Sequence, residues 1–260
     1  MSKSRFVVDI GNTHIVMGIY RDNSLVHSWR IGTDYAKTED EYFSIIKILS
    51  QEGAVDFAEI SIAAIASVVP ELTRVFSHLV KKYLKCPLIV VTAKTDLGLS
   101  FPMKNPEFIG ADLLVNAFAA KEIYRENCIV CDFGTATTIQ LVGADGFFYG
   151  TVISPGVITS AANLFKKASL LSNVELKPPQ KVLGTSTEDA LLSGILSGNT
   201  FMIDGFISAI RDEYKHLGTI KAVATGGIAG LICQNSRKID LINKNLTLDG
   251  LNLICQRHHE

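Results

Sequence analysis

The sequence predicts an α/β protein built from two similar halves. A short apolar strand that ends in an acid and runs into a glycine turn occurs twice, at residues 6–13 and 129–135. In both places a hairpin of two further strands is expected next, and helical patterns alternating with strands follow it. Self-similarity over about half a chain indicates a duplicated fold. The 260 residues suffice for two compact domains of moderate size.

The composition favours a globular chain without a strongly charged partner. Hydrophobic residues make up 47% and charged residues 20%, which allows a substantial core. The net charge of -1, without a Lys/Arg block, excludes the electrostatic pattern of nucleic-acid or anionic-membrane binding. No signal peptide is recognisable, and no apolar stretch is read as long enough to cross a bilayer. We therefore expect a cytoplasmic protein with no nucleic-acid and no membrane partner.

The five cysteines are interpreted as reduced core residues, because they are few, odd in number and mostly set in apolar runs. Cys128 and Cys131 have C-x-x-C spacing, but no second pair of metal ligands follows them. Metal or redox use of this pair is therefore the weaker interpretation.

The first half is predicted to alternate strands with helices. A helix is expected to begin near Thr38, because Glu39 and Asp40 in its first turn suit the helix dipole. Pro70 is typical of the first position of a second helix. The predicted elements are strands at 6–9, 15–20 and 24–30, the helix from 38, a strand at 60–68, a helix at 70–84, a strand at 88–91, a loop at 98–106 and a helical stretch at 110–126.

The second half repeats this order with longer helices. Its predicted elements are strands at 129–132, 136–142 and 146–153, helices at 156–171 and 187–215, a strand at 221–224 and a last helix from about 249. No low-complexity linker separates the halves. We predict an N-terminal domain at 1–115 and a C-terminal domain at 116–260, with the boundary inside a helical region.

The two acid-glycine turns can bind phosphate. Glycine lets the backbone approach a phosphate closely, and N–H and threonine hydroxyl groups can then donate to its oxygens. An acid at the strand end can hold a divalent ion against those phosphates. A single such turn is more often an ordinary hairpin connection. Two copies at matching positions, from Asp9 and from Asp132, favour the phosphate interpretation, with Thr13, Thr135, Thr137 and Thr138 as hydroxyl donors.

A third turn, Thr225-Gly226-Gly227, follows a predicted strand and opens a helix. Paired glycines there would let a nucleotide's sugar and base lie against the backbone. A tight strand-to-helix turn is the alternative, but its place after two phosphate turns favours an adenosine site. The chain has no G-x-x-x-x-G-K-[ST] loop and no protein-kinase motif pair.

Together, the three turns resemble the actin-like ATPase superfamily, which includes sugar kinases and Hsp70 chaperones. This resemblance implies two ribonuclease H-like domains packed around a nucleotide cleft. Further segments are similar to type III pantothenate kinase, in the family's order from about residue 5 to 255. They are Gly11-Asn12-Thr13, Asn105-Pro106, Gly110-Ala111-Asp112, Thr135-Ala136-Thr137-Thr138, Ser154-Pro155-Gly156 and Leu246-Thr247-Leu248-Asp249-Gly250-Leu251.

The resemblance implies transfer of the ATP γ-phosphate to pantothenate, the first step of coenzyme A biosynthesis. Asp112 would be the catalytic base, Asp9 would handle phosphates and Mg²⁺, and Asp132 would sit at a monovalent cation, K⁺ or NH₄⁺. A homodimer is also implied. Residues expected to bind ATP are Asp9, Ile10, Gly11, Asn12, Thr13, His14, Ile15, Val16, Thr135, Gly226 and Gly227. Residues expected to bind pantothenate are Met103, Gly110, Ala111, Asp112, Leu113 and Thr187.

Two positions depart from the family pattern. Leu113 stands where the family has arginine, and leucine offers no guanidinium to the substrate. Met103 stands where the family usually has tyrosine. Both changes lie at the expected pantothenate site and not at the expected ATP site. A weakly active regulatory paralogue and a kinase of another small hydroxy acid are therefore alternatives. His14 is interpreted as a packing or surface residue rather than a catalytic group.

Overall fold

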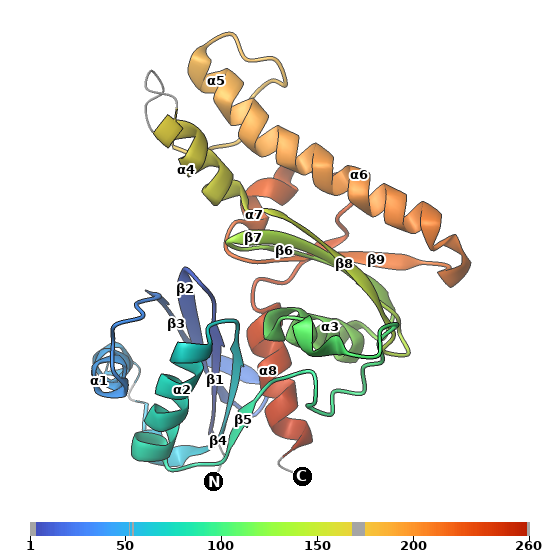
Figure 1. Cartoon of the computed structure of the whole chain (residues 1–260). Coiled ribbons are helices and arrows are strands. Elements are labelled where there is room, and N and C mark those ends of the chain that lie inside the picture. The colour runs from blue at the N-terminus through green and yellow to red at the C-terminus, as the bar shows by residue number, and fades with distance from the viewer. Residues whose placement is uncertain (1–3, 52, 54, 168–174, 259–260) are drawn as a thin grey trace. The chain divides into compact units, whose positions relative to one another are not determined.

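The computed structural model describes residues 4–51, 53, 55–167 and 175–258 (Figure 1). Contacts divide the chain into two compact units. The first takes in the described residues up to Gly98, Met103–Ala119 and those from Leu246. The second takes in Leu99–Pro102 and Ala120–Asn245. This division differs from the predicted boundary after residue 115, because the C-terminal helix packs on the sheet of the first unit.

The first unit contains a five-stranded mixed sheet in the order β3-β2-β1-β4-β5. β1, β2 and β3 are antiparallel, whereas β4 and β5 run parallel to β1. The strands are β1 Ser4–Ile10, β2 His14–Arg21, β3 Ser24–Gly32, β4 Ile60–Ser67 and β5 Leu88–Val90.

The second unit contains a sheet with the same connectivity, in the order β10-β9-β6-β7-β8. β6, β7 and β8 are antiparallel, and β9 and β10 continue the sheet in parallel. The strands are β6 Asn127–Phe133, β7 Ala136–Val142, β8 Phe148–Pro155, β9 Ile220–Thr225 and β10 Leu241–Ile242. The two sheets confirm the predicted α/β fold of two similar halves; the short strand β10 was not predicted.

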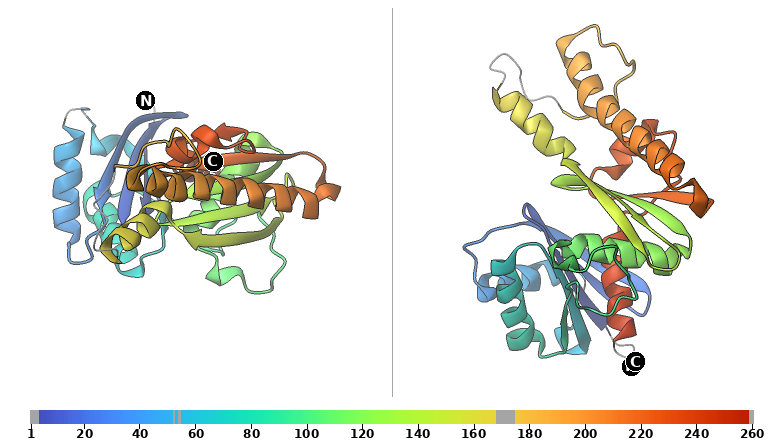
Figure 2. Two further views of the ribbon diagram at one scale, coloured as in Figure 1. Left: turned by 90° about the horizontal axis from the view of Figure 1, so that it is seen from above. Right: turned by 45° about the vertical axis from the view of Figure 1, so that its right-hand side comes forward.

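Helices cover both faces of the first sheet. The helices are α1 Glu39–Ser50, α2 Pro70–Leu79 with its π-helical continuation Val80–Leu84, and α8 Leu246–Arg257. Thr38 caps α1 through a capping box with Glu41, as the predicted start requires. α1 and α2 pack their apolar side chains against one face of the sheet. α8 packs on the other face against β1 and β4, and Figures 1 and 2 show this arrangement.

Side-chain hydrogen bonds anchor α8 on the first sheet. The hydroxyl of buried Tyr20 donates to Oδ1 of Asp249 at 2.5 Å. Arg5 donates to Oδ1 of Asn252 at 3.0 Å. α8 begins at Leu246, three residues earlier than predicted, so its first turn already carries buried side chains.

In the second unit, apolar residues from the helices pack on one face of the sheet. The helices are α4 Val157–Lys167, α5 Thr187–Leu192, the π-helical segment Ser193–Ser197, α6 Gly198–Glu213 and α7 Ala229–Ile232. The part of the predicted helix 156–171 beyond 167 lies outside the described residues. Helix α3 Ala111–Tyr124 begins in the first unit and ends in the second. Short 3₁₀ turns occupy Phe57–Glu59, Pro106–Phe108, Lys215–Leu217 and Cys233–Asn235.

One helical run bears on the expectation that no uninterrupted apolar stretch is long enough to cross a bilayer. Thr187–Glu213 is long and apolar enough by length and composition. Some of its apolar residues, among them Leu192, Ile203 and Ile207, are buried in the core of the second unit, whereas Phe201 is exposed. Part of the run thus contributes to the core of the second unit.

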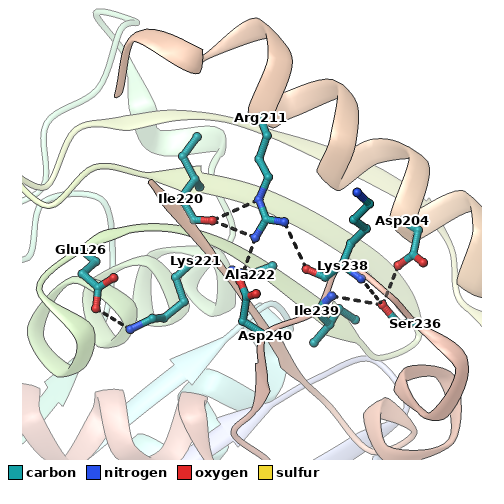
Figure 3. Close-up of polar contacts among 10 residues, drawn as sticks. All are labelled: Glu126, Asp204, Arg211, Ile220, Lys221, Ala222, Ser236, Lys238, Ile239 and Asp240. Carbon is teal, nitrogen blue, oxygen red and sulfur yellow. Dashed lines mark hydrogen bonds and ion pairs between the residues drawn. The ribbon is translucent and has the colours of Figure 1, made fainter. Parts of the chain in front are cut away.

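A polar network fixes α6 to the edge of the second sheet (Figure 3). Arg211 donates to the carbonyl of Ile220 at 2.8 Å and to Asp240 Oδ2 at 2.7 Å. The same Asp240 oxygen accepts from the backbone N–H of Ala222 at 2.7 Å. One guanidinium thus joins the helix to the start of β9 and to the chain that leads into β10.

The five cysteines are all free thiols, and Cys128, Cys131 and Cys255 are buried. Burial raises the pKa of the Cys128 thiol to about 12. These residues therefore pack as small apolar side chains.

Candidate active site

The first acid-glycine turn connects β1 to β2. Asp9 pairs with Val16 and Ile10 pairs with Ile15, so the loop consists of the residues between them. The N–H of Gly11 donates to the carbonyl of His14 at 3.0 Å and closes the turn. Asn12 and Thr13 at its tip are exposed and accessible to a ligand.

Ile10 and Ile15, both expected to bind ATP, have fully buried side chains in the core of the first unit. Only their main-chain atoms border the turn. Val16 is half-buried and lies beside Asp9 in the neighbouring strand.

The second turn connects β6 to β7 and is one residue shorter, since Phe133 pairs with Thr137. The N–H of Gly134 donates to the carbonyl of Ala136 at 3.1 Å. Thr135 is exposed, whereas Thr137 is fully buried and its Oγ1 has no hydrogen-bond partner among the described residues. Thr137 is therefore not presented as a phosphate donor, contrary to the expectation from the sequence.

The acid of each turn points to the sheet face opposite the core that contains its neighbour, Ile10 or Phe133. In the first sheet this is the face on which α8 packs. Side chains alternate along a strand, and the neighbours Ile10 and Phe133 belong to the two cores. Asp9 and Asp132 consequently point to the other face of their own sheets, and both are half-buried.

Hydroxyl residues flank Asp132 on both sides. Asp132 pairs with Thr138 of β7 and with Thr225 of β9. Directly paired residues present their side chains on the same face of a sheet. The arrangement gathers oxygen-bearing side chains in one row across the second sheet.

The third turn lies against the second turn within the second unit. Gly226 has a φ of +94°, which favours glycine. A Cβ at Gly226 would lie 2.6 Å from Asp132 Oδ1 and 2.6 Å from the backbone nitrogen of Phe133. The predicted second phosphate loop and the predicted adenosine loop are therefore in direct contact.

Asp112 occupies the first turn of α3 in the first unit. Its Oδ1 accepts from the N–H of Leu113 at 2.9 Å, and the carboxylate folds over Gly110. Burial raises the pKa of this carboxyl, and the hydrogen bond from Leu113 opposes the shift. A carboxylate with a raised pKa is a stronger base than an ordinary aspartate.

The remaining residues expected to contact pantothenate lie in three environments. Leu113 and Ala111 are buried in α3, and Met103 is half-buried in the preceding loop. Thr187 is exposed at the start of α5 in the second unit, directly after the capping residue Ser186.

His14 is held by Arg30. A 2.8 Å contact joins His14 Nδ1 to Arg30 Nη2. Partial burial and the nearby guanidinium lower the pKa of His14, so the neutral ring accepts this hydrogen bond. His14 is half-buried beside Arg30 of β3, and its expected contact with ATP stays a prediction.

Several residues next to the turns were not predicted from the sequence. Thr33 and Tyr35 contact the first turn, and Thr159 contacts the second. Residues 31–37 also line an open cavity of about 590 Å³ beside the first turn. No local motif marks these residues, because each contact spans about 20 residues of sequence.

A family model described as type III pantothenate kinase matches residues 5–209 of this chain. A type III pantothenate kinase from Desulfosudis oleivorans is 43% identical, covering 95% of this chain and 97% of its own length. The enzyme of the same name from Halalkalibacterium halodurans is 39% identical, covering 97% and 98%.

Among solved structures, one from Sinorhizobium meliloti is described as a "putative 2-dehydro-3-deoxygalactonokinase protein". It matches with a TM-score of 0.58 and 11% identity, covering 98% of this chain and 96% of that one. At this identity the likeness concerns the fold alone, and it supports the predicted actin-like ATPase fold of sugar kinases.

Proposed function

The chain belongs to the type III pantothenate kinase family, and we propose how its residues carry out the reaction of that family. The protein is an ATP-dependent kinase that phosphorylates pantothenate in coenzyme A biosynthesis. The observation that carries this function is the match to curated enzymes over nearly the whole chain. The two acid-glycine turns supply local chemistry that fits it.

We assign the role of general base to Asp112. As the pantothenate hydroxyl oxygen attacks the γ-phosphorus, the bond from that phosphorus to the ADP oxygen breaks and the hydroxyl proton passes to the Asp112 carboxylate. Its raised pKa, caused by burial, supports this assignment because proton acceptance becomes more favourable.

The exposed tips of the two turns are the proposed phosphate contacts. Asn12 and Thr13 serve in the first unit, and Thr135 serves in the second. Gly226 and Gly227 are the proposed adenosine contacts, supported by the closeness of Gly226 to the second turn.

Mg²⁺ and a monovalent cation are the proposed ions. The described residues contain no group of three or more His, Cys, Asp or Glu that could hold a metal by themselves. The single carboxylate of Asp9 fits a Mg²⁺ ion whose other ligands are phosphate oxygens and water. Asp132, flanked by Thr138 and Thr225, offers oxygen donors suited to K⁺ or NH₄⁺. Bound cations would neutralise charge on the phosphates.

A cytoplasmic homodimer is the proposed assembly. Two helices of the second unit carry exposed apolar side chains: Ile158 and Leu164 on α4, and Phe201 on α6, each at least 43% exposed. Such a set is typical of a surface that another protein covers.

The deciding experiment is an ADP-release assay with ATP, pantothenate, Mg²⁺ and either K⁺ or Na⁺. We expect turnover that requires pantothenate and is higher with K⁺. ATP binding without pantothenate-dependent turnover would contradict the acceptor assignment, and a panel of small hydroxy acids would then identify the acceptor. Equal turnover with Na⁺ would contradict only the cation assignment.

A further inference from the structure

Three consecutive carbonyl groups of the first turn are held by one short segment after β3. Thr33 Oγ1 donates to the carbonyl of Gly11 at 2.7 Å, and the Thr33 N–H donates to the carbonyl of Thr13 at 3.0 Å. The carbonyl between them, on Asn12, lies 3.5 Å from the Tyr35 hydroxyl. One residue thus fixes both ends of the turn, and a second contacts its middle.

This segment is itself anchored in the core. The hydroxyl of Tyr42 donates to the carbonyl of Asp34 at 2.8 Å and accepts from the Asp34 N–H at 3.1 Å. Tyr42 is fully buried and packs against Phe76 with ring centroids 4.9 Å apart. A continuous path of contacts therefore leads from the core of the first unit to the first turn.

The second unit repeats the arrangement with different residues. Gly156, directly after β8, donates its N–H to the carbonyl of Thr135 at 3.1 Å, as Thr33 does to Thr13. A side chain is excluded here, because a Cβ at Gly156 would overlap the carbonyls of Gly134 and Thr135. The hydroxyl comes instead from Thr159, which donates to the same Thr135 carbonyl at 3.1 Å.

These contacts have a chemical consequence for a phosphate-binding turn. A peptide group that directs its N–H towards an anion must direct its carbonyl away from it, and a carbonyl that accepts a hydrogen bond behind the turn holds that orientation. Preorganised donors bind an anion without the cost of reorienting the backbone.

We propose that Thr33 and Thr159 are positioning residues, which orient the backbone of the two phosphate turns for ATP through their hydroxyl groups. Thr33 has the larger effect, because its hydroxyl donates to a carbonyl that its own backbone N–H does not hold, that of Gly11. Thr159 shares its single acceptor with Gly156. The inference rests on the proposed function, since it assumes that the turns bind ATP.

The test is isothermal titration calorimetry of Mg·ATP with wild type, Thr33→Val and Thr33→Ser, together with steady-state kinetics. Valine keeps the shape of threonine and removes the hydroxyl, whereas serine keeps the hydroxyl. We expect Thr33→Val to raise the Kd for ATP about five- to tenfold, the effect of one lost hydrogen bond, and Thr33→Ser to stay within about twofold of wild type. The KM for ATP rises in parallel, and the KM for pantothenate changes by less than about twofold.

Three further variants complete the test. Thr159→Val is expected to weaken ATP binding about two- to threefold, because Gly156 still holds the carbonyl. Tyr35→Phe alters an exposed side chain, so it reports on the first turn even if Thr33→Val fails to fold; we expect about a twofold loss. Thr200→Val is the matched control, since its buried hydroxyl donates to helix carbonyls at 2.9–3.0 Å away from both turns. It lowers stability and leaves the Kd for ATP unchanged.

Wild-type affinity for ATP in Thr33→Val and Tyr35→Phe would overturn the positioning role and leave the proposed function intact. Equal losses in Thr33→Val and Thr33→Ser would also overturn it, because the hydroxyl would then be irrelevant. Absence of ATP binding by wild type would contradict the proposed function itself.

Discussion

Gly226 and Asp132 approach each other so closely that a Cβ on the glycine would lie 2.6 Å from the carboxylate oxygen. The positive φ of +94° at Gly226 adds a second constraint, since side chains rarely tolerate that conformation. One glycine therefore joins the third turn to the acid of the second turn inside the second unit.

Gly226→Ala is expected to displace Asp132 and to reduce kcat/KM for ATP at least about tenfold, because the added methyl meets both a carboxylate and the backbone. The strained backbone also lowers stability by about 1–3 kcal/mol. Steady-state kinetics and thermal unfolding measure the two effects. Gly230→Ala is the control, since a Cβ there meets nothing within 4 Å. Unchanged ATP kinetics in Gly226→Ala would refute the coupling of these two turns.

Asp112→Asn removes the proposed base and keeps an oxygen that can accept from Leu113. We expect kcat to fall about 10²- to 10⁴-fold with the Kd for ATP nearly unchanged. In wild type, kcat/KM for pantothenate is expected to fall as the pH drops through the raised pKa of Asp112. Asp212→Asn, on the exposed end of α6, is a control that should leave kcat as it is. A kcat close to wild type in Asp112→Asn would remove the residue from the mechanism.

The raised pKa of Asp112 also predicts how the stability of the folded protein depends on pH. Burial raises the pKa of Asp112, so the folded protein holds this proton more tightly than the unfolded chain does. The charged form therefore destabilises the folded state above the raised pKa, and this destabilisation disappears as the pH falls through it. Asp112→Asn should unfold at a higher Tm than wild type at about pH 7.5, and the difference should shrink towards about pH 3.5. A difference that does not vary with pH would show that the carboxyl is not perturbed.

Leu113→Arg restores the side chain that the family has at this position. If wild type binds pantothenate without that guanidinium, we expect the KM for pantothenate to fall about tenfold, the effect of one charged hydrogen bond. A lower Tm should accompany the gain, because Leu113 is only 6% exposed and its site is apolar. Leu113→Met is the control that keeps the apolar volume. An unchanged or higher KM would argue that the acceptor site of this chain is built differently.

Tyr20→Phe tests the attachment of α8 to the first sheet. Loss of the buried hydrogen bond to Asp249 is expected to cost about 1–3 kcal/mol of stability. Tyr83→Phe is matched to it, since the Tyr83 hydroxyl donates to Asp40 at 2.7 Å where solvent can replace it. Denaturant unfolding compares the two, and equal losses would show that burial of the Tyr20 bond contributes nothing.

The parts of the fold that follow from local sequence were predictable. Asp9 and Asp132 marked the two turns, and Thr38 with Glu41 marked the start of α1. The contacts of Thr33 and Thr159 were not predictable, because they join residues far apart along the chain. Thr137 was expected to donate its hydroxyl to phosphate, but its position in β7 turns the side chain towards the core and buries it.

The packing of α8 on β1 and β4 also governs the order in which the chain can fold during synthesis. Residues 246–257 leave the ribosome after the entire second unit, yet they cover one face of a sheet whose strands were made first. That face, with Val7 and Gly18, stays open to water or to chaperones until α8 arrives. The second unit can close its core before α8 is synthesised. We therefore expect the second unit to become protease-resistant before the first unit does.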